Sequence, residues 1–307
     1  MLGRIAYQLW FRPIGWTRKV LRQGVGRSWA AARGEAAMRE AAARLTPLAT
    51  PAGAPYAVPV AFLTGERYWH QTLFCARSLQ RLSPRPIRFR FLDDGTISPD
   101  VAARLLAQHP GAVVESAADL TARLDAALPA DRFPRLRARR LVYPHLRKLV
   151  DAHAGRTGWG LVLDSDMLFQ AEPTELLQWL EAPEAPVHLL EDRSYYGYSD
   201  GLMRAIAGAE LPERVNVGLI GLRSESIDWA LLERWLAELQ RAEGDHYLQE
   251  QALTAMLLAG RPHTVLDGRR YWCNPPADEC RRPTAALHHY VAESRLDLYI
   301  DAWRRQP

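Results

Sequence analysis

The chain alternates between short apolar runs and longer segments in which apolar residues recur at helical spacing. The run at 160–163 has the length of a buried strand, whereas residues 68–82 place apolar side chains three and four positions apart. Because strands and helices take turns along the chain, we expect an α/β domain with a mainly parallel sheet flanked by helices. The pattern predicts strands at 56–64, 87–92, 112–115, 160–163, 187–190 and 216–222, and helices at 68–82, 98–108, 144–154, 173–180, 226–240 and 247–260.

The first 50 residues differ from the rest in charge and composition. Residues 1–45 hold nine basic and two acidic side chains, a net charge of +7; the whole chain carries +4, so the remainder carries −3. Ser28 is placed to cap a helix rich in alanine that ends near Leu45, and the Pro, Ala and Gly residues of 46–55 predict a linker. We therefore expect a basic helical extension with its linker over 1–50 and an α/β domain over 51–307.

Residues 1–24 mix basic side chains with Trp10, Phe11 and Trp16, as an interfacial membrane anchor does. A helix docked on the domain and a basic arm fit this segment equally well. No apolar run reaches about 18 residues, and we expect no signal peptide because the N-terminal residues lack an uninterrupted apolar core and a small-residue cleavage site. Its three cysteines match no zinc spacing and suit a reducing compartment. We expect a cytoplasmic protein, in peripheral contact with the inner membrane face if residues 1–24 are an anchor.

The most informative motif is the acid pair of Asp164-Ser165-Asp166, which directly follows the predicted strand at 160–163 and precedes the apolar Met167. Carboxylates near a buried strand are costly unless they are paired or bind a cation. Mg²⁺ and Mn²⁺ take oxygen ligands and keep open positions for substrate phosphates. The motif therefore predicts a metal–phosphate site at the carboxyl edge of the sheet, although a solvated turn with two acids is the simpler alternative.

Two further strand ends are expected at the same edge. The first strand ends in Thr64-Gly65, and the second in Asp93-Asp94-Gly95. Glycine permits a ligand to approach the backbone, and a carboxylate there can accept hydrogen bonds from a ribose or a base; a plain turn explains Asp93-Asp94-Gly95 as well. Lys148 is one of only two lysines among 39 basic residues, which indicates either a phosphate-binding ammonium or chance.

In its order of motifs the chain resembles the GT-A fold nucleotide-sugar glycosyltransferases, and it is similar to the glycogenin-like family-eight enzymes. The resemblance extends over roughly residues 56–300, and the combination of motifs is more specific than any one of them. The motifs are Thr64-Gly65, Asp93-Asp94-Gly95, Arg147-Lys148, LVLDSDMLF at 161–169, NVGLIGL at 216–222, EQAL at 250–253 and LHHYVAESR at 287–295.

The resemblance implies a metal-dependent transfer of sugar from a nucleoside-diphosphate sugar, most simply a UDP-sugar, to a glycan, glycolipid or small-molecule acceptor. Asp164 and Asp166 would hold Mn²⁺ or Mg²⁺, with His289 as the third ligand and His288 as the neighbouring alternative. Nucleic acid is not an expected partner, because basic–aromatic interleaving is absent from the domain. The expected donor-binding residues are Thr64, Gly65, Asp93, Asp94, Arg147, Lys148, Ser165, Asn216, Gly218 and Arg295.

The expected catalytic residues are Glu250, Gln251 and Asp192. Glu250-Gln251 matches the family's Asp-Gln pair, with Glu in place of Asp. The likeness favours a retaining reaction, which needs no strong base; an inverting one would require a carboxylate base, Glu250 or Asp192. Glu250 could also be an ordinary acid in the first turn of a helix. Ala292 replaces the family's glycine, which weakens the case for a close backbone contact with phosphate.

Three other functions fit parts of the sequence. A haloacid-dehalogenase-like phosphatase also uses a strand-end Asp-x-Asp, but its motif continues differently and lies near the start of a domain. A sugar-phosphate nucleotidyltransferase would share the sheet, but Thr64 to Arg67 is too short for its glycine-rich loop. An inactive GT-A scaffold at a membrane is the non-enzymatic alternative, which the intact acid pair and the late histidine disfavour.

Overall fold

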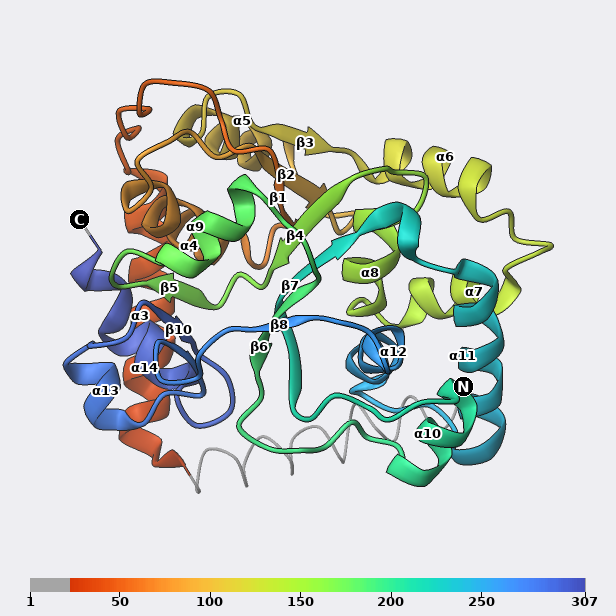
Figure 1. Ribbon diagram of the computed structural model, residues 1–307. Coiled ribbons are helices and arrows are strands. Elements are labelled where there is room, and N and C mark those ends of the chain that lie inside the picture. The colour runs from red at the N-terminus through yellow and green to blue at the C-terminus, as the bar shows by residue number, and fades with distance from the viewer. Residues whose placement is uncertain (1–22, 307) are drawn as a thin grey trace, which may run out of the picture.

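The computed structural model describes residues 23–306, and its centre is a seven-stranded sheet with the order β3-β2-β1-β4-β7-β6-β8 (Figure 1). Most neighbouring strands are parallel, but β7 runs antiparallel to both β4 and β6. The start of β7 therefore lies at the same edge as the ends of the parallel strands. The bounds are β1 Val60–Thr64, β2 Phe89–Asp93, β3 Val113–Glu115, β4 Trp159–Leu163, β6 Val187–Leu190, β7 Val215–Arg223 and β8 Thr264–Val265.

A second, three-stranded sheet lies beside the first and has the order β5-β10-β9. Its strands are β5 Met167–Phe169, β9 Tyr271–Cys273 and β10 Leu287–His289. Strand β5 follows β4 after only three residues, so the acid pair stands at the junction of the two sheets. Strand β10 is antiparallel to β5 and parallel to β9. This pairing brings the late histidines of the sequence to the acid pair.

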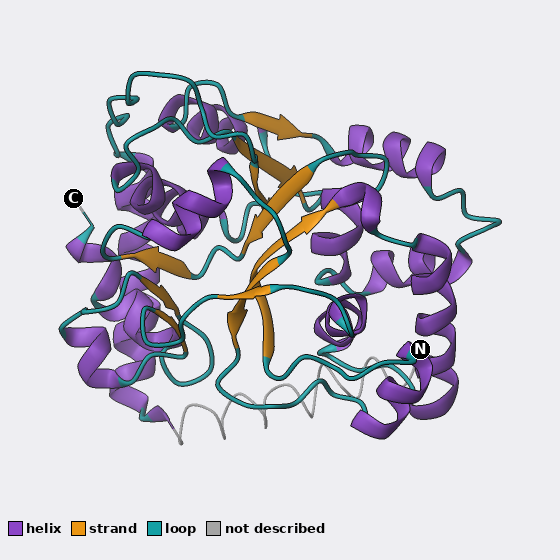
Figure 2. Ribbon diagram, viewed as in Figure 1, coloured by secondary structure: helices purple, strands orange, loops and turns teal. Residues whose placement is uncertain are grey.

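Helices cover both faces of the large sheet and form two apolar clusters (Figure 2). One cluster contains α3 Val25–Ala43, α4 Trp69–Arg81, α5 Pro99–Gln108, α9 Thr174–Glu181 and α14 Arg295–Ile300 together with the small sheet. The other contains α6 Ala117–Ala127, α7 Pro134–Val142, α8 Leu146–His153, α10 Asp200–Ala207, α11 Trp229–Glu243 and α12 Gln249–Leu258. The short helix α13 covers Ala277–Arg281.

The structure confirms the predicted fold class, a mainly parallel α/β sheet flanked by helices. Each predicted strand and helix of the domain is present with small differences at its ends; the largest is in the first strand, which begins at Val60 rather than at residue 56. Ser98 caps α5 as expected, since its Oγ accepts from the Val101 amide at 3.3 Å. The pattern of the sequence did not predict helices α6, α7, α10, α13 and α14, or strands β5, β8, β9 and β10.

Helix α3 lies against α14 and α4 in the first cluster. A side chain at Gly34 would collide with the backbone carbonyl of Tyr299, so glycine permits this close packing. The helix begins after Gly24, so the predicted cap at Ser28 is wrong: Ser28 lies within the helix, and its hydroxyl makes no hydrogen bond. The predicted membrane anchor at 1–24 lies almost wholly outside the described residues. Within residues 23–306, no helix is both long and apolar enough to cross a bilayer.

Candidate metal and donor-binding site

The acid pair and one histidine converge at the junction of the two sheets. Asp164 follows β4, Asp166 precedes β5, and His289 ends β10, where it is the register partner of Met167. His289 Nε2 lies 3.4 Å from Asp166 Oδ1 and 3.8 Å from Asp164 Oδ2. One ligand atom from each of the three residues lies within 4.8 Å of the others. The three predicted metal ligands are thus brought together.

These three side chains fit a divalent cation. His289 is buried and its Nε2 makes no hydrogen bond of good geometry, although it faces two carboxylates. Burial opposes charge on the imidazole, but Asp166 and Asp164 outweigh it and raise the pKa of His289. Burial likewise opposes ionisation of Asp166, while His289 lowers the pKa of its carboxyl. Two carboxylates and an imidazole nitrogen facing one point are a donor set that Mn²⁺ or Mg²⁺ accepts.

Strand β7 leaves room for the histidine. A Cβ at Gly218 would lie 2.3 Å from His289 Cε1, so only glycine fits there. The Gly218 carbonyl accepts from the Asp164 amide at 2.7 Å, and its own amide donates to Asn216 Oδ1 at 2.9 Å. Asn216 and Gly218, both predicted to face the donor, therefore lie directly beside the metal-site residues because β7 is antiparallel.

Lys148 joins the acid pair to helix α12. Its Nζ donates to Asp164 Oδ1 at 2.8 Å and lies 3.6 Å from Glu250 Oε2. Burial opposes the ammonium charge, but Asp164 and Glu250 raise the pKa of Lys148. Burial raises the pKa of Glu250 to about 7, against the opposing effect of Lys148. Because Lys148 occupies only one oxygen of Asp164, the other oxygen remains directed toward His289.

Helix α12 is fixed by aromatic residues at its first turn. The Glu250 amide donates to Tyr143 Oη at 3.4 Å, and the same hydroxyl donates to the carbonyl of Tyr247. Gln251 Nε2 donates to the carbonyl of Tyr195 at 3.5 Å. These contacts hold Glu250 where it lies near Lys148. They also connect Gln251 to the loop that follows β6.

The end of β1 is linked to the acid pair by hydroxyl groups. Thr64 Oγ1 and Thr72 Oγ1 are 2.7 Å apart, and Thr72 Oγ1 is also 2.7 Å from Ser165 Oγ. A Cβ at Gly65 would lie 2.0 Å from Asp94 Oδ1, so a side chain there would displace the Asp94 carboxylate. Thr64, Gly65 and Ser165 therefore lie along one edge, as the sequence predicted for donor-binding positions.

The turn after β2 satisfies its own polar groups. Asp93 Oδ1 accepts from the amides of Gly95, Thr96 and Ile97 at 2.8–2.9 Å, and its Oδ2 accepts from the Ala117 amide at 3.3 Å. Asp94 Oδ1 accepts from both the amide and the hydroxyl of Thr96. This geometry is that of a hydrogen-bonded turn.

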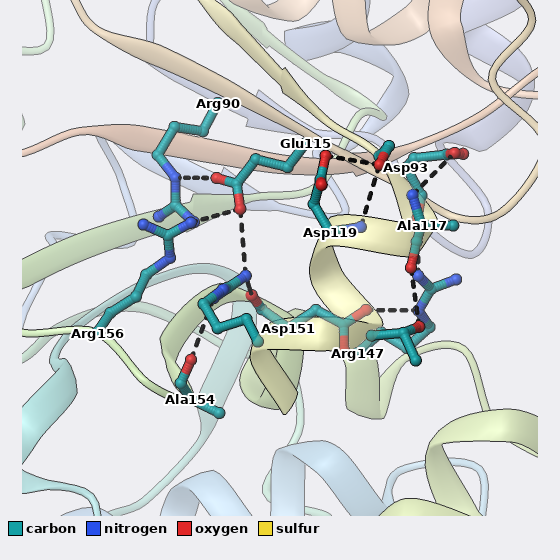
Figure 3. A network of polar contacts seen from close by, with 12 residues as sticks. Arg90, Asp93, Glu115, Ala117, Asp119, Arg147, Asp151, Ala154 and Arg156 are labelled. Atoms are coloured by element: carbon teal, nitrogen blue, oxygen red, sulfur yellow. Dashed lines mark hydrogen bonds and ion pairs between the residues drawn. The ribbon is translucent and has the colours of Figure 1, made fainter. Parts of the chain in front are cut away.

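Arg147 donates hydrogen bonds to the backbone of this turn (Figure 3). Its Nη2 donates to the Asp93 carbonyl at 2.7 Å and its Nη1 to the Asp94 carbonyl at 2.6 Å. Its Nε donates to Asp151, which also accepts two hydrogen bonds from Arg140. The guanidinium of Arg147 is therefore occupied by the protein itself and positions the β2 turn.

The remaining predicted residues surround this centre. Arg295 begins α14, and although burial opposes its charge, Asp166 raises the pKa of its guanidinium. Asp192 is exposed, and its Oδ2 accepts from Asn274 Nδ2 at 3.1 Å. His288 faces away from the acid pair: its Nε2 is 2.9 Å from Glu279 Oε1 and its Nδ1 is 3.1 Å from Tyr290 Oη. Of the adjacent histidines, His289 is the one placed to bind a cation.

Two polar side chains next to these residues, Asp151 and Cys273, were not predicted as part of the site. Asp151, which is fully buried between two arginines, was treated only as part of a helix. The cysteines were considered only for zinc spacing and redox compartment, yet Cys273 Sγ lies 3.9 Å from His289 Nδ1 and donates to Glu191 Oε1 at 3.3 Å. A spacing of four between Arg147 and Asp151 was a readable signal for a helical ion pair, whereas nothing local marked Cys273.

This chain is similar to known proteins in its structure. No protein-family model matches it, and no curated protein matches it. Among solved structures it is similar to the WbbM bifunctional glycosyltransferase, with 15% identity and a TM-score of 0.52 over 86% of this chain and 51% of that one. It also resembles mouse xyloside xylosyltransferase 1, at 14% identity and a TM-score of 0.51 over 79% of this chain and 99% of that one.

A third similar structure is the galactosyltransferase LgtC in complex with donor and acceptor sugar analogues. It has 14% identity and a TM-score of 0.51, over 81% of this chain and 100% of that one. These likenesses show that the chain has the GT-A fold, as its order of motifs predicted. The narrower resemblance to the family-eight enzymes stays a prediction.

Proposed function

We propose that the protein transfers a sugar from a UDP-sugar to a hydroxyl of a glycan, glycolipid or small-molecule acceptor, with retention of configuration. The observation that supports this most strongly is the convergence of Asp164, Asp166 and His289 at the carboxyl edge of a GT-A sheet. Such edges are where open α/β sheets bind ligands. The similar structures named above are glycosyltransferases, and transfer by this chain is our inference from fold and site together.

In this proposal Asp164, Asp166 and His289 hold Mn²⁺ or Mg²⁺ beside the diphosphate of the donor. The bound cation supplies Lewis-acid neutralisation of the charge on the departing diphosphate. Arg295, whose charge acts on Asp166, adds a second positive group on the same side. In this proposal the nucleoside binds along the edge that carries Thr64, Gly65, Asp93, Asp94 and Ser165, and Asn216 and Gly218 would contact the sugar.

The transfer breaks the bond between the anomeric carbon and the β-phosphate oxygen and forms a bond from that carbon to the acceptor oxygen. The acceptor proton passes to the departing diphosphate. Burial raises the pKa of Glu250 to about 7, which would suit a general base in an inverting reaction, but the retaining reaction proposed here needs no strong base. In this proposal Glu250 and Gln251 stabilise the positive charge that develops at the anomeric centre. Asp192, exposed and bound to Asn274, would be the base only in an inverting reaction.

We propose that the exposed tyrosines Tyr195 and Tyr247 contact the acceptor. Tyr195 and Tyr247 are 54% and 68% exposed, whereas Tyr196 and Tyr198 are buried. The exposed pair is tied to α12 through Gln251 and through Tyr143, which also binds the Glu250 amide. Tyrosine rings beside a catalytic carboxylate are suitable surfaces for the apolar face of a sugar.

The proposal also includes a cytoplasmic location with peripheral membrane contact through residues 1–24. The basic and aromatic composition of that segment supports it. So do Val25 and Trp29, which follow it and are 63% and 62% exposed. Flotation with vesicles of anionic lipid tests this contact: Trp29→Ser should reduce the bound fraction, and equal binding of both proteins to neutral and anionic vesicles would contradict it.

Isothermal titration with UDP and with GDP, each with and without Mn²⁺, tests the donor assignment. We expect Mn²⁺-dependent binding of UDP, followed by release of UDP from one member of a UDP-sugar panel. Selective binding of GDP would overturn the choice of donor. Absence of binding for both nucleotides would favour the inactive scaffold.

A further inference from the structure

Strand β9 places a thiol directly beside the predicted metal-ligating histidine. Strands β9 and β10 are parallel, and Cys273 is the register partner of His289. Both side chains are buried, and Cys273 Sγ lies 3.9 Å from His289 Nδ1. The imidazole therefore has two distinct sides: Nε2 faces the two aspartates, and Nδ1 faces the thiol.

The thiol is itself held by polar groups. Its Sγ lies 3.3 Å from Glu191 Oε1, and because a carboxylate can only accept, the thiol hydrogen is directed to Glu191. Asn216 Nδ2 donates to the same Sγ at 3.4 Å and to Glu191 Oε2 at 2.8 Å. With its hydrogen committed to Glu191, the sulfur is left as an acceptor toward Asn216 and His289.

This arrangement selects one form of the imidazole. A histidine that binds a cation through Nε2 must carry its proton on Nδ1. Metal-ligating histidines ordinarily donate that second N–H to a carboxylate, a carbonyl or water. Within residues 23–306, His289 Nδ1 has one hydrogen-bond partner, Cys273 Sγ. The thiol thus stands where a carboxylate or carbonyl is usual.

We propose that Cys273, oriented by Glu191 and Asn216, is a positioning residue that accepts the Nδ1–H of His289 and so presents Nε2 to the divalent cation. The inference rests on the cation site of the proposed function and adds to it a residue outside the ligand set. A purely structural cysteine would require only volume, and valine would supply that. A positioning cysteine requires a hydrogen-bonding atom, which serine retains and valine lacks.

The test is the affinity of the metal-free protein for Mn²⁺, measured from the EPR signal of free Mn²⁺. Removing an outer partner of a metal-bound histidine weakens metal binding by about 10- to 100-fold. We expect losses of that size for Cys273→Val and Cys273→Ala, and a loss of no more than about threefold for Cys273→Ser. Cys280→Ala is the matched control, since that buried thiol contacts the Pro275 carbonyl and none of the predicted ligands.

Thermal unfolding of each variant separates loss of the site from loss of the fold. Wild-type affinity in Cys273→Val, or equal losses in the serine and valine variants, would overturn the inference while leaving the proposed function intact. Absence of Mn²⁺ binding by the wild-type protein would overturn the proposed function and the inference with it. Rescue by serine alone supports the positioning role, because packing would favour valine.

Discussion

Two acid pairs lie at strand ends on the same edge of the sheet: Asp93-Asp94 at the end of β2, and Asp164 with Asp166 after β4. The two pairs differ in whether the protein itself satisfies their carboxylates. Asp93, the last residue of β2, accepts three amides of the following turn with Oδ1 and the Ala117 amide at the start of α6 with Oδ2. Asp164 and Asp166, after β4, face a buried imidazole nitrogen that makes no hydrogen bond. The first pair is satisfied by the protein, whereas the second has capacity left for a cation.

The difference teaches where to look for function in this fold. Buried polar groups are almost always paired, and those that are not need an explanation. The β2 turn, together with Arg147 and Asp151, is expected to contribute stability. The junction of β4, β5 and β10 is expected to contribute binding. Substitutions in the two regions should therefore separate stability from metal affinity.

The largest loss of stability should come from Asp151→Asn. Asp151 is fully buried and pairs with both Arg140 and Arg147. Breaking a buried pair by removing one partner costs about 3–5 kcal/mol, because a charge is left uncompensated. Urea unfolding measures this. The control Asp125→Asn, at an exposed carboxylate paired with Arg137, should change stability by less than about 1 kcal/mol. Equal effects of the two variants would contradict the buried network.

Glu250→Gln should change how stability depends on pH. The pKa of Glu250 is about 7 in the folded protein, above its ordinary value of 4.5. Between these values the folded chain keeps the proton that the unfolded chain has lost, so the wild type loses stability as pH rises from about 4.5 to 7.

The glutamine variant lacks this effect. Its unfolding free energy relative to wild type should therefore rise across that window, by up to about 3 kcal/mol. Urea unfolding at pH 5, 6, 7 and 8 checks the direction. A difference between the two proteins that stays constant with pH would show that Glu250 titrates normally.

Asp93→Ala should destabilise the protein by about 1–3 kcal/mol, because it removes a buried charged acceptor that binds three amides of the turn after β2. Since the β2 turn lies outside the cation site, the folded variant should bind Mn²⁺ as the wild type does. Urea unfolding measures the free energy of unfolding, and EPR titration measures the affinity for Mn²⁺. A loss of Mn²⁺ affinity without loss of stability would reverse the roles assigned to the two regions.

The smallest effect expected is a gain at Ala292. This residue has a φ of 45°, in the left-handed region that favours glycine. Ala292→Gly should therefore stabilise the protein by about 0.5–1 kcal/mol. The same change at Ala205, on an exposed position of helix α10, should instead destabilise it by about 1 kcal/mol. Thermal unfolding of both variants would show whether the signs differ.

The elements that could be predicted from the sequence are those whose signal lies within a few neighbouring residues. The run at 160–163 with its acid pair, and the apolar spacing of residues 68–82, each contain their signal within a few residues. Helix α6 was missed because, apart from Leu120 and Leu124, its side chains are not buried. Helix α7 was missed because arginines fill four of its nine positions.

The three-stranded sheet could not be predicted from the sequence, for a different reason. Strands β5, β9 and β10 have three residues each and exist through pairing between distant segments. The motif resemblance did place His289 among the ligands, and the structure brings it to the acid pair. It could not place Cys273, because the register that joins Cys273 to His289 is a property of the folded sheet.

The most direct test of the central claim compares the two acid pairs in one measurement. EPR titration of Mn²⁺ is carried out on the wild type, Asp166→Asn and Asp94→Asn, without nucleotide. We predict that the wild type and Asp94→Asn bind Mn²⁺ with similar affinity and that Asp166→Asn loses at least about 100-fold, since it removes a charged ligand from the site. Equal affinity in all three proteins would contradict the account, because the carboxylates after β4 would then differ in no functional way from those after β2.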